Sequence, residues 1–499
     1  MKKYLITFLA LALIFPAALI AVQVIASEAD DEVSYTESTI LGNPREADGI
    51  EVSLNLEAMD RLFWDVDLTL GEEIDCDADF DFDYDPPRYV SELKPSFDIG
   101  LDVSSFGSST SGGNLLDGEH YLFGLYDMIA DVAERTPDGE EHTETVRLAD
   151  YYDYYPIYLE IRIGDFHYSP HDTGRYNDVK YSLLIEKMKS YFEKNFQYPI
   201  PSSDRHTVTV TKNIAGIVTG VHVNRADDAP FKYLETRSLV SDDAIYFAVV
   251  PVSEDGEEME FEGKHGLYRI PYQIVPYEKP QSAAGYNLGE EYTDIMIDHA
   301  ELVYPMADGT EVGTLTFSHD GSELYLTVIS RGEEQDEVSL TVLDCADMTV
   351  KQETPLFTME KNGNYQLMHT AEDFLVFRIT WNTFAVIEKS SGKWQTDFTV
   401  TDEMISDYWS DQTYITSAYG YGFDYDGERL AVMGCSNRYA HNGSEHRESS
   451  LAAFYVSIYS EKGNLYTGKF TSSLDTGTAL VYNDIVKPTD RYTPVIRLP

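Results

Sequence analysis

Cysteine is scarce in this chain of 499 residues, and its scarcity excludes a protein held together by many disulfides and a protein built around cysteine-bound zinc. The three cysteines are scattered and odd in number: Cys76, Cys345 and Cys435. Neither a disulfide framework nor a zinc-ligand spacing is therefore present. One bridge among the three is an alternative that the sequence leaves open, but the stability of the fold has to come mainly from burial of apolar surface.

Basic residues are also few, since 36 of them stand against 87 acidic residues and the formal net charge is −51. A surface of this charge repels nucleic acid phosphates and anionic lipid headgroups, so nucleic acid binding is excluded. The acidity favours a soluble surface surrounded by counterions. Capture of Ca²⁺ or of a cationic partner is the alternative, and no other cofactor is indicated.

Several catalytic motifs are missing from the chain. It contains no Gly-x-Ser-x-Gly elbow, no His-Glu-x-x-His sequence and no phosphate-cradling glycine loop. Paired carboxylates for glycoside hydrolysis stay an alternative, because acidic residues are abundant and only their spacing in the fold is diagnostic. The sequence favours a protein that is not an enzyme, and it assigns no catalytic, cofactor-binding or metal-binding residue.

A long apolar run lies at the N-terminus. Lys2 and Lys3 precede it and acidic residues follow it, a charge order that sends the rest of the chain across a membrane. The run covers residues 5–26, longer than the apolar region of about 7 to 15 residues in a signal peptide, which favours an uncleaved anchor. Pro16 and the small residues before Ser27 favour cleavage. Residues 1–26 are predicted to be a signal peptide or transmembrane anchor of a bacterial-type envelope protein, whose body is extracytoplasmic and either anchored or secreted.

The remaining chain is too long for one compact core, which predicts either a ring of repeats or two domains. Residues 27–45 are polar and acidic and are expected to form a linker. Residues 46–103 are predicted to be an N-terminal β segment, in which 50–70 show the alternation of strands. Residues 104–113 resemble a flexible loop, and 114–499 are expected to form a β-propeller-like domain.

Every second residue from Asp75 to Asp85 is aspartate, so an extended chain places these carboxylates on one face. One interpretation is a Ca²⁺ site. The other is a solvated edge strand whose charges prevent edge-to-edge aggregation. The edge strand is favoured because the run lacks the turn glycine of a Ca²⁺ loop, and Pro86 and Pro87 end it.

One pattern recurs along the chain: an acidic or Asp-Gly turn followed by a short apolar strand. The copies begin at Asp117-Gly118, Asp242-Asp243, Asp320-Gly321, Glu372-Asp373 and Asp426-Gly427. The last three continue with a second strand, a polar turn and a third strand, which is the strand order of a propeller blade.

Residues 312–475 therefore resemble the WD40-like and YVTN-like β-propellers, whose blades often begin with a phrase such as Phe317-Ser318-His319-Asp320-Gly321. The resemblance implies an all-β, mainly antiparallel ring and does not imply an activity. Tandem β-sandwich domains are the alternative fold. The C-terminal residues 493–498 are expected to form a last strand that pairs with an early strand.

A helix is predicted over residues 178–196. Leu184, Met188, Phe192 and Phe196 recur at intervals of four, and lysines occupy the other faces. We expect this helix to dock on the carboxylates of the protein's own body. Contact with lipid headgroups or with an acidic partner is the alternative.

Two histidine pairs were considered as metal ligands. His167 and His171 have the spacing of ligands on a helix, but Pro170 and Gly174 favour a loop and no third ligand is evident. His441 and His446 are expected in a hairpin extension: a surface loop is preferred to a metal site for both pairs.

Tyrosine is abundant, with 37 residues, and it is densest at Tyr151, Tyr152, Tyr154, Tyr155 and Tyr158. Tyrosine is common in strands, and this interpretation is favoured. The alternative is a face that binds sugar rings or a protein partner. The overall expectation is a binding or scaffold protein of the cell envelope. A polysaccharide-active enzyme and an accessory or sensory subunit of a membrane complex are the alternatives.

Overall fold

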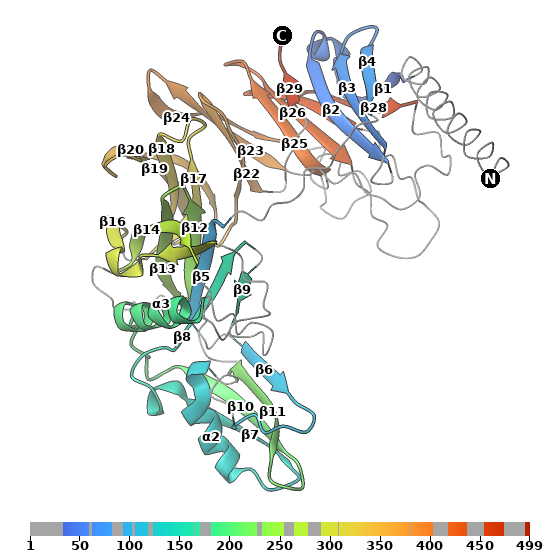
Figure 1. Ribbon diagram of the computed structural model, residues 1–499. Helices are drawn as coiled ribbons and strands as arrows, with labels where there is room; N and C mark the ends of the chain where they lie inside the picture. The colour runs from blue at the N-terminus through green and yellow to red at the C-terminus, as the bar shows by residue number, and fades with distance from the viewer. Residues whose placement is uncertain are drawn as a thin grey trace, which may run out of the picture. The chain divides into compact units, whose positions relative to one another are not determined.

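The computed structural model describes residues 33–58, 62–81, 93–101, 105–117, 123–164, 166–169, 181–226, 232–253, 264–277, 291–307, 309–380, 382–402, 418–436, 454–473 and 495–499. The structure is mainly antiparallel β, as predicted. It divides into two compact units (Figure 1). The first unit comprises residues 1–88 and 363–499, and the second comprises 89–362. These boundaries differ from the predicted ones, because strands from both ends of the chain belong to the same sheets of the first unit.

The described part of the first unit contains three antiparallel sheets. One has the order β21-β22-β23-β24, with bounds Gln366–Thr370, Phe374–Thr380, Thr383–Ser390 and Lys393–Thr401. The next has the order β1-β28-β27-β26-β25, with bounds Tyr35–Gly42, Gly463–Ser472, Phe454–Ser460, Leu430–Ser436 and Ala418–Tyr425. The third has the order β29-β2-β3-β4, with bounds Val495–Arg497, Glu51–Ala58, Leu62–Thr69 and Asp75–Asp81.

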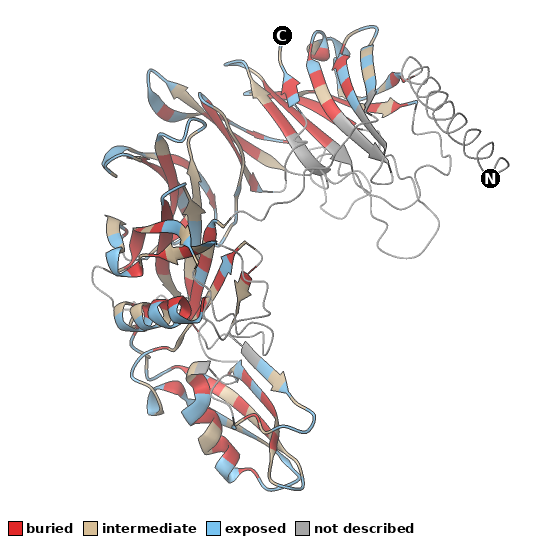
Figure 2. Ribbon diagram, in the orientation of Figure 1, coloured by how far each residue is buried: buried red, intermediate tan, exposed pale blue. Residues whose placement is uncertain are grey.

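These sheets stack face to face in the manner of propeller blades. Strand β26 shows how: Val432 enters the core shared with β21–β24, whereas its neighbour Met433 enters the core shared with β2 and β3. Successive side chains of a strand point to opposite faces, so a strand in the middle layer is buried on both sides. Figure 2 shows the described side chains of this strand as buried, which explains why its sequence is an almost unbroken apolar run.

The repeated turn-and-strand pattern is confirmed for four of its copies. Strand β13 (Ala244–Ser253) follows Asp242-Asp243, and strands β18 (Glu323–Ser330), β22 and β26 follow the three later turns. At Asp320 the turn is closed by hydrogen bonds from Ser318 and Ser322 to its carboxylate. For the copy at Asp117, Tyr121 and Leu122 lie outside the described residues, and Phe123, the third residue of the predicted strand, instead begins the 3-10 helix η2 (Phe123–Leu125), which leads into a helix.

Both ends of the chain contribute edge strands to the first unit. Strand β29 pairs with β2, with Ile496 opposite Val52, which confirms that the last strand pairs with an early one. Strand β1 pairs with β28 and buries Tyr35, followed by η1 (Pro44–Ala47). The prediction of a linker over 27–45 is therefore wrong for β1, because the free edge of β28 supplies hydrogen-bond partners that composition does not reveal.

Gly42 ends β1 in a backbone conformation that an L-residue rarely adopts, with φ of 79°. A Cβ at this position would lie 1.9 Å from the carbonyl oxygen of Leu465. We expect Gly42→Ala to lower the stability of the first unit by on the order of 2 kcal/mol in urea unfolding. Gly71→Ala is the control, since the nearest atom there is 3.6 Å away. Equal midpoints for the two variants would contradict the prediction.

The aspartate run forms β4, which pairs with β3 alone and is the edge of its sheet. Asp75, Asp77 and Asp79 are exposed, whereas Cys76 and Ala78 between them are half-buried against the core. The favoured interpretation as a solvated edge strand is thus confirmed for this part of the run. The aspartates beyond Asp81 lie outside the described residues.

The second unit contains four sheets among its described residues. Their orders are β6-β11-β10-β7, β5-β8-β9, β12-β13-β14-β15 with β16 also paired to β14, and β17-β18-β19-β20. The strands not yet introduced are β5 (Pro95–Leu101), β6 (Ser105–Ser109), β7 (Glu141–Arg147), β8 (Ile157–Ile163), β9 (Phe166–Tyr168), β10 (Arg205–Lys212), β11 (Val218–Arg225), β12 (Lys232–Val240), β14 (Gly266–Pro276), β15 (Glu291–Ile295), β16 (Glu301–Pro305), β17 (Thr310–Phe317), β19 (Gln335–Asp344) and β20 (Val350–Glu360).

Two α-helices lie among the described residues of the second unit. Helix α3 (Ser182–Asn195) confirms the predicted helix, although its start is later than expected. Its lysine side docks on the protein's own carboxylates at one point, because Lys187 Nζ lies 2.9 Å from Asp298 Oδ2. Helix α2 (Tyr126–Arg135) was not predicted and packs on β10 and β7. It buries Met128, Ile129 and Val132, the one-sided spacing that could have identified it.

Strand β6 corrects a second prediction, that of a loop over residues 104–113. Ser105–Ser109 pairs with β11, and Gly107 lies opposite His222. Serine and glycine suggested a loop, but here they occupy an edge strand where the neighbouring strand dictates the conformation. Among the described residues, no helix is long and apolar enough to cross a membrane. The predicted anchor or signal at 1–26 lies outside the described residues.

Candidate functional site

A pocket of about 370 Å³ lies in the second unit and is lined mainly by aromatic residues. Helix α3 supplies two polar side chains, Lys189 and Glu193, and Gln197 follows just beyond the C-terminal end of the helix. Residues four apart on a helix share a face, so Lys189 and Glu193 lie on the same face of α3. Five tyrosines line the rest of the pocket together with apolar side chains: Tyr152, Tyr154, Tyr155, Tyr158 and Tyr168.

The tyrosine cluster is therefore not the strand that the sequence favoured. Only Tyr158 of the predicted group lies in a strand, β8, while the four earlier tyrosines belong to the irregular segment before it. The ring of Tyr158 lies against Gly100 of β5, where a Cβ would be 2.4 Å from Tyr158 Cε1. Glycine at that position lets the ring approach the strand, and the alternative of a tyrosine-rich binding face gains support.

Tyr155 is held in place from behind the pocket. It is 3% exposed, and its hydroxyl donates a hydrogen bond of 2.5 Å to Asp204 Oδ2. The other oxygen of Asp204 lies 3.2 Å from Nε2 of His206, and both of these residues are buried. The distance between Asp204 and His206 is short enough for an ion pair, but the imidazole nitrogens of His206 form no hydrogen bond of good geometry within the described chain. This buried network fixes one aromatic wall of the pocket.

A second polar network supports the neighbouring tyrosine. The hydroxyl of Tyr151 donates to Asp131 of α2, and Arg135 of α2 forms ion pairs with Asp131 and with Glu144 of β7. Burial and then the hydrogen bond to Asp131 raise the pKa of Tyr151. The amide of Met128 donates to the hydroxyl of Tyr152 at 3.4 Å. Helix α2 thus helps to position the segment that carries the pocket tyrosines.

The polar groups facing the pocket are not all engaged. Within the described parts of the chain, Lys189, Glu193 and Gln197 form no hydrogen bond or ion pair, and neither do the hydroxyls of Tyr154 and Tyr168. Lys187, one position away on the same helix, is paired with Asp298. Free donors and acceptors beside flat rings are what a ligand with both apolar and polar faces requires.

Of the two histidine pairs, only His167 lies among the described residues, and no group of three potential metal ligands occurs in that part of the chain. His167 lies in β9, where its Nε2 is 2.7 Å from Glu160 Oε1. The expected loop is therefore wrong for His167, which lies in a strand. His171, His441 and His446 lie outside the described residues.

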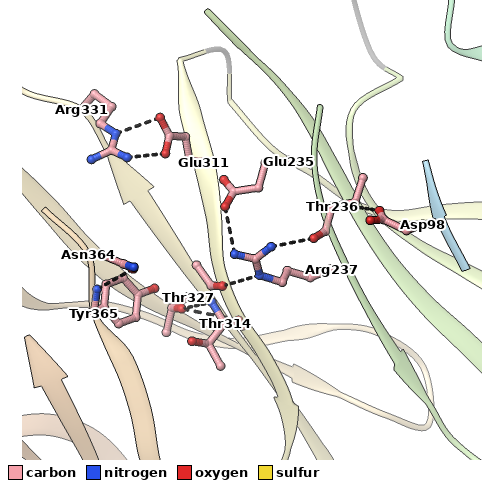
Figure 3. Close-up of polar contacts among 11 residues, drawn as sticks. Asp98, Glu235, Thr236, Arg237, Glu311, Thr314, Thr327, Arg331, Asn364 and Tyr365 are labelled. Atoms are coloured by element: carbon pink, nitrogen blue, oxygen red, sulfur yellow. Dashed lines mark hydrogen bonds and ion pairs between the residues drawn. The ribbon is translucent and has the colours of Figure 1, made fainter. Parts of the chain in front are cut away.

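A second cluster, of buried charges, joins strand β12 to strand β17 and to the turn after β18 (Figure 3). Arg331 binds Glu311 through two hydrogen bonds and also pairs with Asp336. The side chain of Asp336 is 0% exposed and that of Glu311 is 11% exposed. Burial alone would raise the pKa of Asp336, but Arg331 and the amides of Gly332 and Asn362 outweigh burial and lower it.

Glu235 of β12 completes this charge cluster. One oxygen accepts a hydrogen bond of 3.1 Å from Arg237, while Oε2 is buried without a partner of good geometry. Burial raises the pKa of Glu235 to about 7, and the nearby Glu311 adds to this, although Arg237 and Arg331 oppose it. Arg237 also donates to the carbonyls of Gly313 and Thr236, as Figure 3 shows. Every other charged group here is engaged within the protein, so the cluster is interpreted as structural.

No protein-family model matches this chain, and no curated protein matches its sequence. It is similar to the solved structure of a puromycin-hydrolyzing peptidase of Mycobacterium tuberculosis at 11% identity and TM-score 0.20, over 53% of this chain and 44% of the peptidase. Prolyl oligopeptidase B from Galerina marginata is similar at 10% identity and TM-score 0.23, over 85% of this chain and 45% of that one.

The β-propeller domain of Cps50 (Swd1) from Myceliophteria thermophila is similar at 7% identity and TM-score 0.19, over 53% of this chain and 82% of that domain. The chain spans less than half of the length of both peptidases. TM-scores this low support no conclusion about fold or activity. The blade-like sheets described above therefore rest on the geometry of this chain alone.

Proposed function

We propose that this chain is an extracytoplasmic binding protein of the cell envelope, and that the tyrosine-lined pocket binds sugar rings. The observation that carries the proposal is the pairing of five tyrosines with three unengaged polar side chains around one cavity. Sugars present a face of C–H groups that packs on aromatic rings and an edge of hydroxyls that needs donors and acceptors. The tyrosines offer an aromatic wall for the C–H face of a sugar, and the polar side chains offer donors and acceptors for its hydroxyls.

The charge of the chain supports the same class of ligand. A formal net charge of −51 disfavours the dense phosphates of nucleic acid and of anionic membranes, whereas the packing of sugar rings and the hydrogen bonds of their hydroxyls depend on local contacts in the pocket. The extracytoplasmic location rests on residues 1–26, whose charge order and apolar length are those of an export signal or anchor. The stacked sheets of the first unit support propeller-like blades as part of the scaffold.

A polysaccharide-active enzyme is the alternative function. Hydrolysis of a glycosidic bond by the usual mechanisms needs two carboxylates about 5 to 10 Å apart across the bond. Among the described residues, Glu193 is the only carboxylate that lines the pocket. Binding without hydrolysis is therefore favoured. The further alternative, an accessory subunit of a membrane complex, requires that the N-terminal segment is retained as an anchor.

Removal of one pocket tyrosine should weaken sugar binding. Tyr168 is half-buried in the pocket wall, and its hydroxyl has no partner within the described chain. We expect Tyr168→Ala to reduce affinity about tenfold, because loss of an aromatic packing surface is worth roughly 1 kcal/mol or more. The measurement is isothermal titration calorimetry of the purified chain against a panel of envelope and plant oligosaccharides.

The matched control is Tyr126→Ala. Tyr126 is 39% exposed on α2 and does not line the pocket, so its loss should leave affinity unchanged. Equal weakening in both variants would indicate a general effect on folding. If no oligosaccharide of the panel binds the unmodified chain, the proposed function is rejected.

A further inference from the structure

One lysine lines the pocket without an ion pair in the described part of the chain. Acidic residues outnumber basic ones by more than two to one, so a lysine has many potential partners. Lys187 uses one of them, Asp298, at 2.9 Å. Lys189 lines the pocket, is half-buried, and pairs with no residue within the described chain. A half-buried ammonium without a partner is left with unused donors, which a ligand can satisfy.

Glu193 lies one helical turn beyond Lys189 on the same face, also without a partner in the described structure. Four residues of helix correspond to roughly 6 Å along the axis. The helix thus presents a cation and an acceptor of hydroxyl protons on one face, and Gln197, beyond the end of α3, adds an amide to the pocket lining. Two charges of opposite sign held apart along one wall discriminate the orientation of a ligand that has a negative group at one end.

We infer that the ligand is a carboxylated sugar, such as a hexuronate unit of an acidic polysaccharide. Its carboxylate binds Lys189, its hydroxyls donate to Glu193 and bond with Gln197, and its ring packs on the tyrosines opposite α3. This inference rests on the proposed function and narrows its substrate class. It also assigns the discrimination between neutral and acidic sugars to Lys189, because the uncharged rings of the tyrosines cannot discriminate by charge.

The geometry accounts for how an acidic protein can bind an acidic ligand. At physiological ionic strength the Debye length is about 8 Å, so most of the chain's negative charge is screened from the pocket. A direct contact with a half-buried lysine is screened much less. The attraction is therefore local, and binding should weaken as salt is raised, because exposed parts of the contact remain subject to screening.

The test compares oligogalacturonate and oligomannuronate with their fully methyl-esterified forms, which keep the rings and remove the charge. We expect the free acids to bind the full chain at least tenfold more tightly than the esters in calorimetry. Lys189→Met should abolish this difference and leave ester binding unchanged. Lys187→Met is the matched control, since Lys187 is engaged by Asp298 and lies outside the pocket lining.

The outcomes separate the two proposals. Equal affinity for acids and esters in the unmodified chain, with no effect of Lys189→Met, would overturn the inference and leave sugar binding standing. Binding of acids that is lost equally in Lys187→Met and Lys189→Met would also overturn it, because the charge effect would then be nonspecific. Absence of binding to every sugar, charged or neutral, would overturn the proposed function as well. Urea midpoints of the variants show whether they are folded.

Discussion

Replacing Arg331 with methionine is expected to destabilise the second unit by about 3 kcal/mol. Arg331 compensates two carboxylates at once, those of Glu311 and Asp336. Without it, the fully buried Asp336 keeps only the amide donors of Gly332 and Asn362. Removal of one partner from a buried pair costs about 3 to 5 kcal/mol because a charge is left uncompensated, and partial exposure of Arg331 places the effect at the lower end.

The measurement is urea unfolding of the full chain at pH 7, monitored by a probe placed in the second unit. Arg162→Met serves as the control: Arg162 pairs with Glu160, but its side chain is 65% exposed, and exposed pairs contribute less than about 1 kcal/mol. Arg331→Lys keeps the positive charge but loses the bidentate contact with Glu311, so it should be more stable than Arg331→Met and less stable than the unmodified chain. If Arg331→Met and Arg162→Met shift the midpoint equally, the account of the cluster is wrong.

Replacing Glu235 with glutamine is expected to stabilise the protein above neutral pH and to change the pH dependence of unfolding. The pKa of Glu235 rises from the ordinary 4.5 to about 7 in the folded chain, chiefly because the side chain is buried. Between these values the folded state binds more protons than the unfolded state, so stability falls as pH rises from about 4.5 to 7 and is constant above.

The raised pKa of Glu235 corresponds to a loss of roughly 3 kcal/mol at most in the free energy of unfolding. Partial exposure of the carboxylate reduces this loss to on the order of 2 kcal/mol. Glu235→Gln imitates the protonated form, so its free energy of unfolding should exceed that of the unmodified chain by this amount at pH 8. The two should converge near pH 4.5. The exposed Glu337 gives the control variant, Glu337→Gln, which should follow the unmodified chain at every pH. Parallel curves for Glu235→Gln and the unmodified chain would refute the prediction.

The sequence predicted elements whose signal is local. The apolar runs after acidic turns became β18, β22 and β26, because a turn and a strand each depend on a few neighbouring residues. Helix α3 was predicted by its apolar residues at intervals of four. The errors concern elements whose partners are distant: β1 depends on the edge of β28, and β6 depends on β11. Helix α2 was missed: a strand was predicted just before it, at residues 121–123, and its own apolar residues were not interpreted.

The pocket shows the same limit. The density of tyrosines near residue 155 was visible in the sequence, but their assignment to a strand was wrong for all of the group except Tyr158. Glu193 and Gln197 carried no signal at all, since a polar residue on an amphipathic helix is ordinarily a solvated one. The charge cluster around Arg331 was equally hidden, because 87 acidic residues make any single pairing invisible in sequence.

By itself the sequence determined the β-rich class, the blade-like repeats, the acidic surface and the charge order of the N-terminal segment, because composition, period and local turns express these directly. The tertiary structure alone decided which tyrosines surround a cavity, which unpaired lysine of α3 lines it, and which glutamate is buried with a pKa near 7. Those properties depend on distances between residues far apart in the chain, and such distances are set by packing and by the loss of water around each charge.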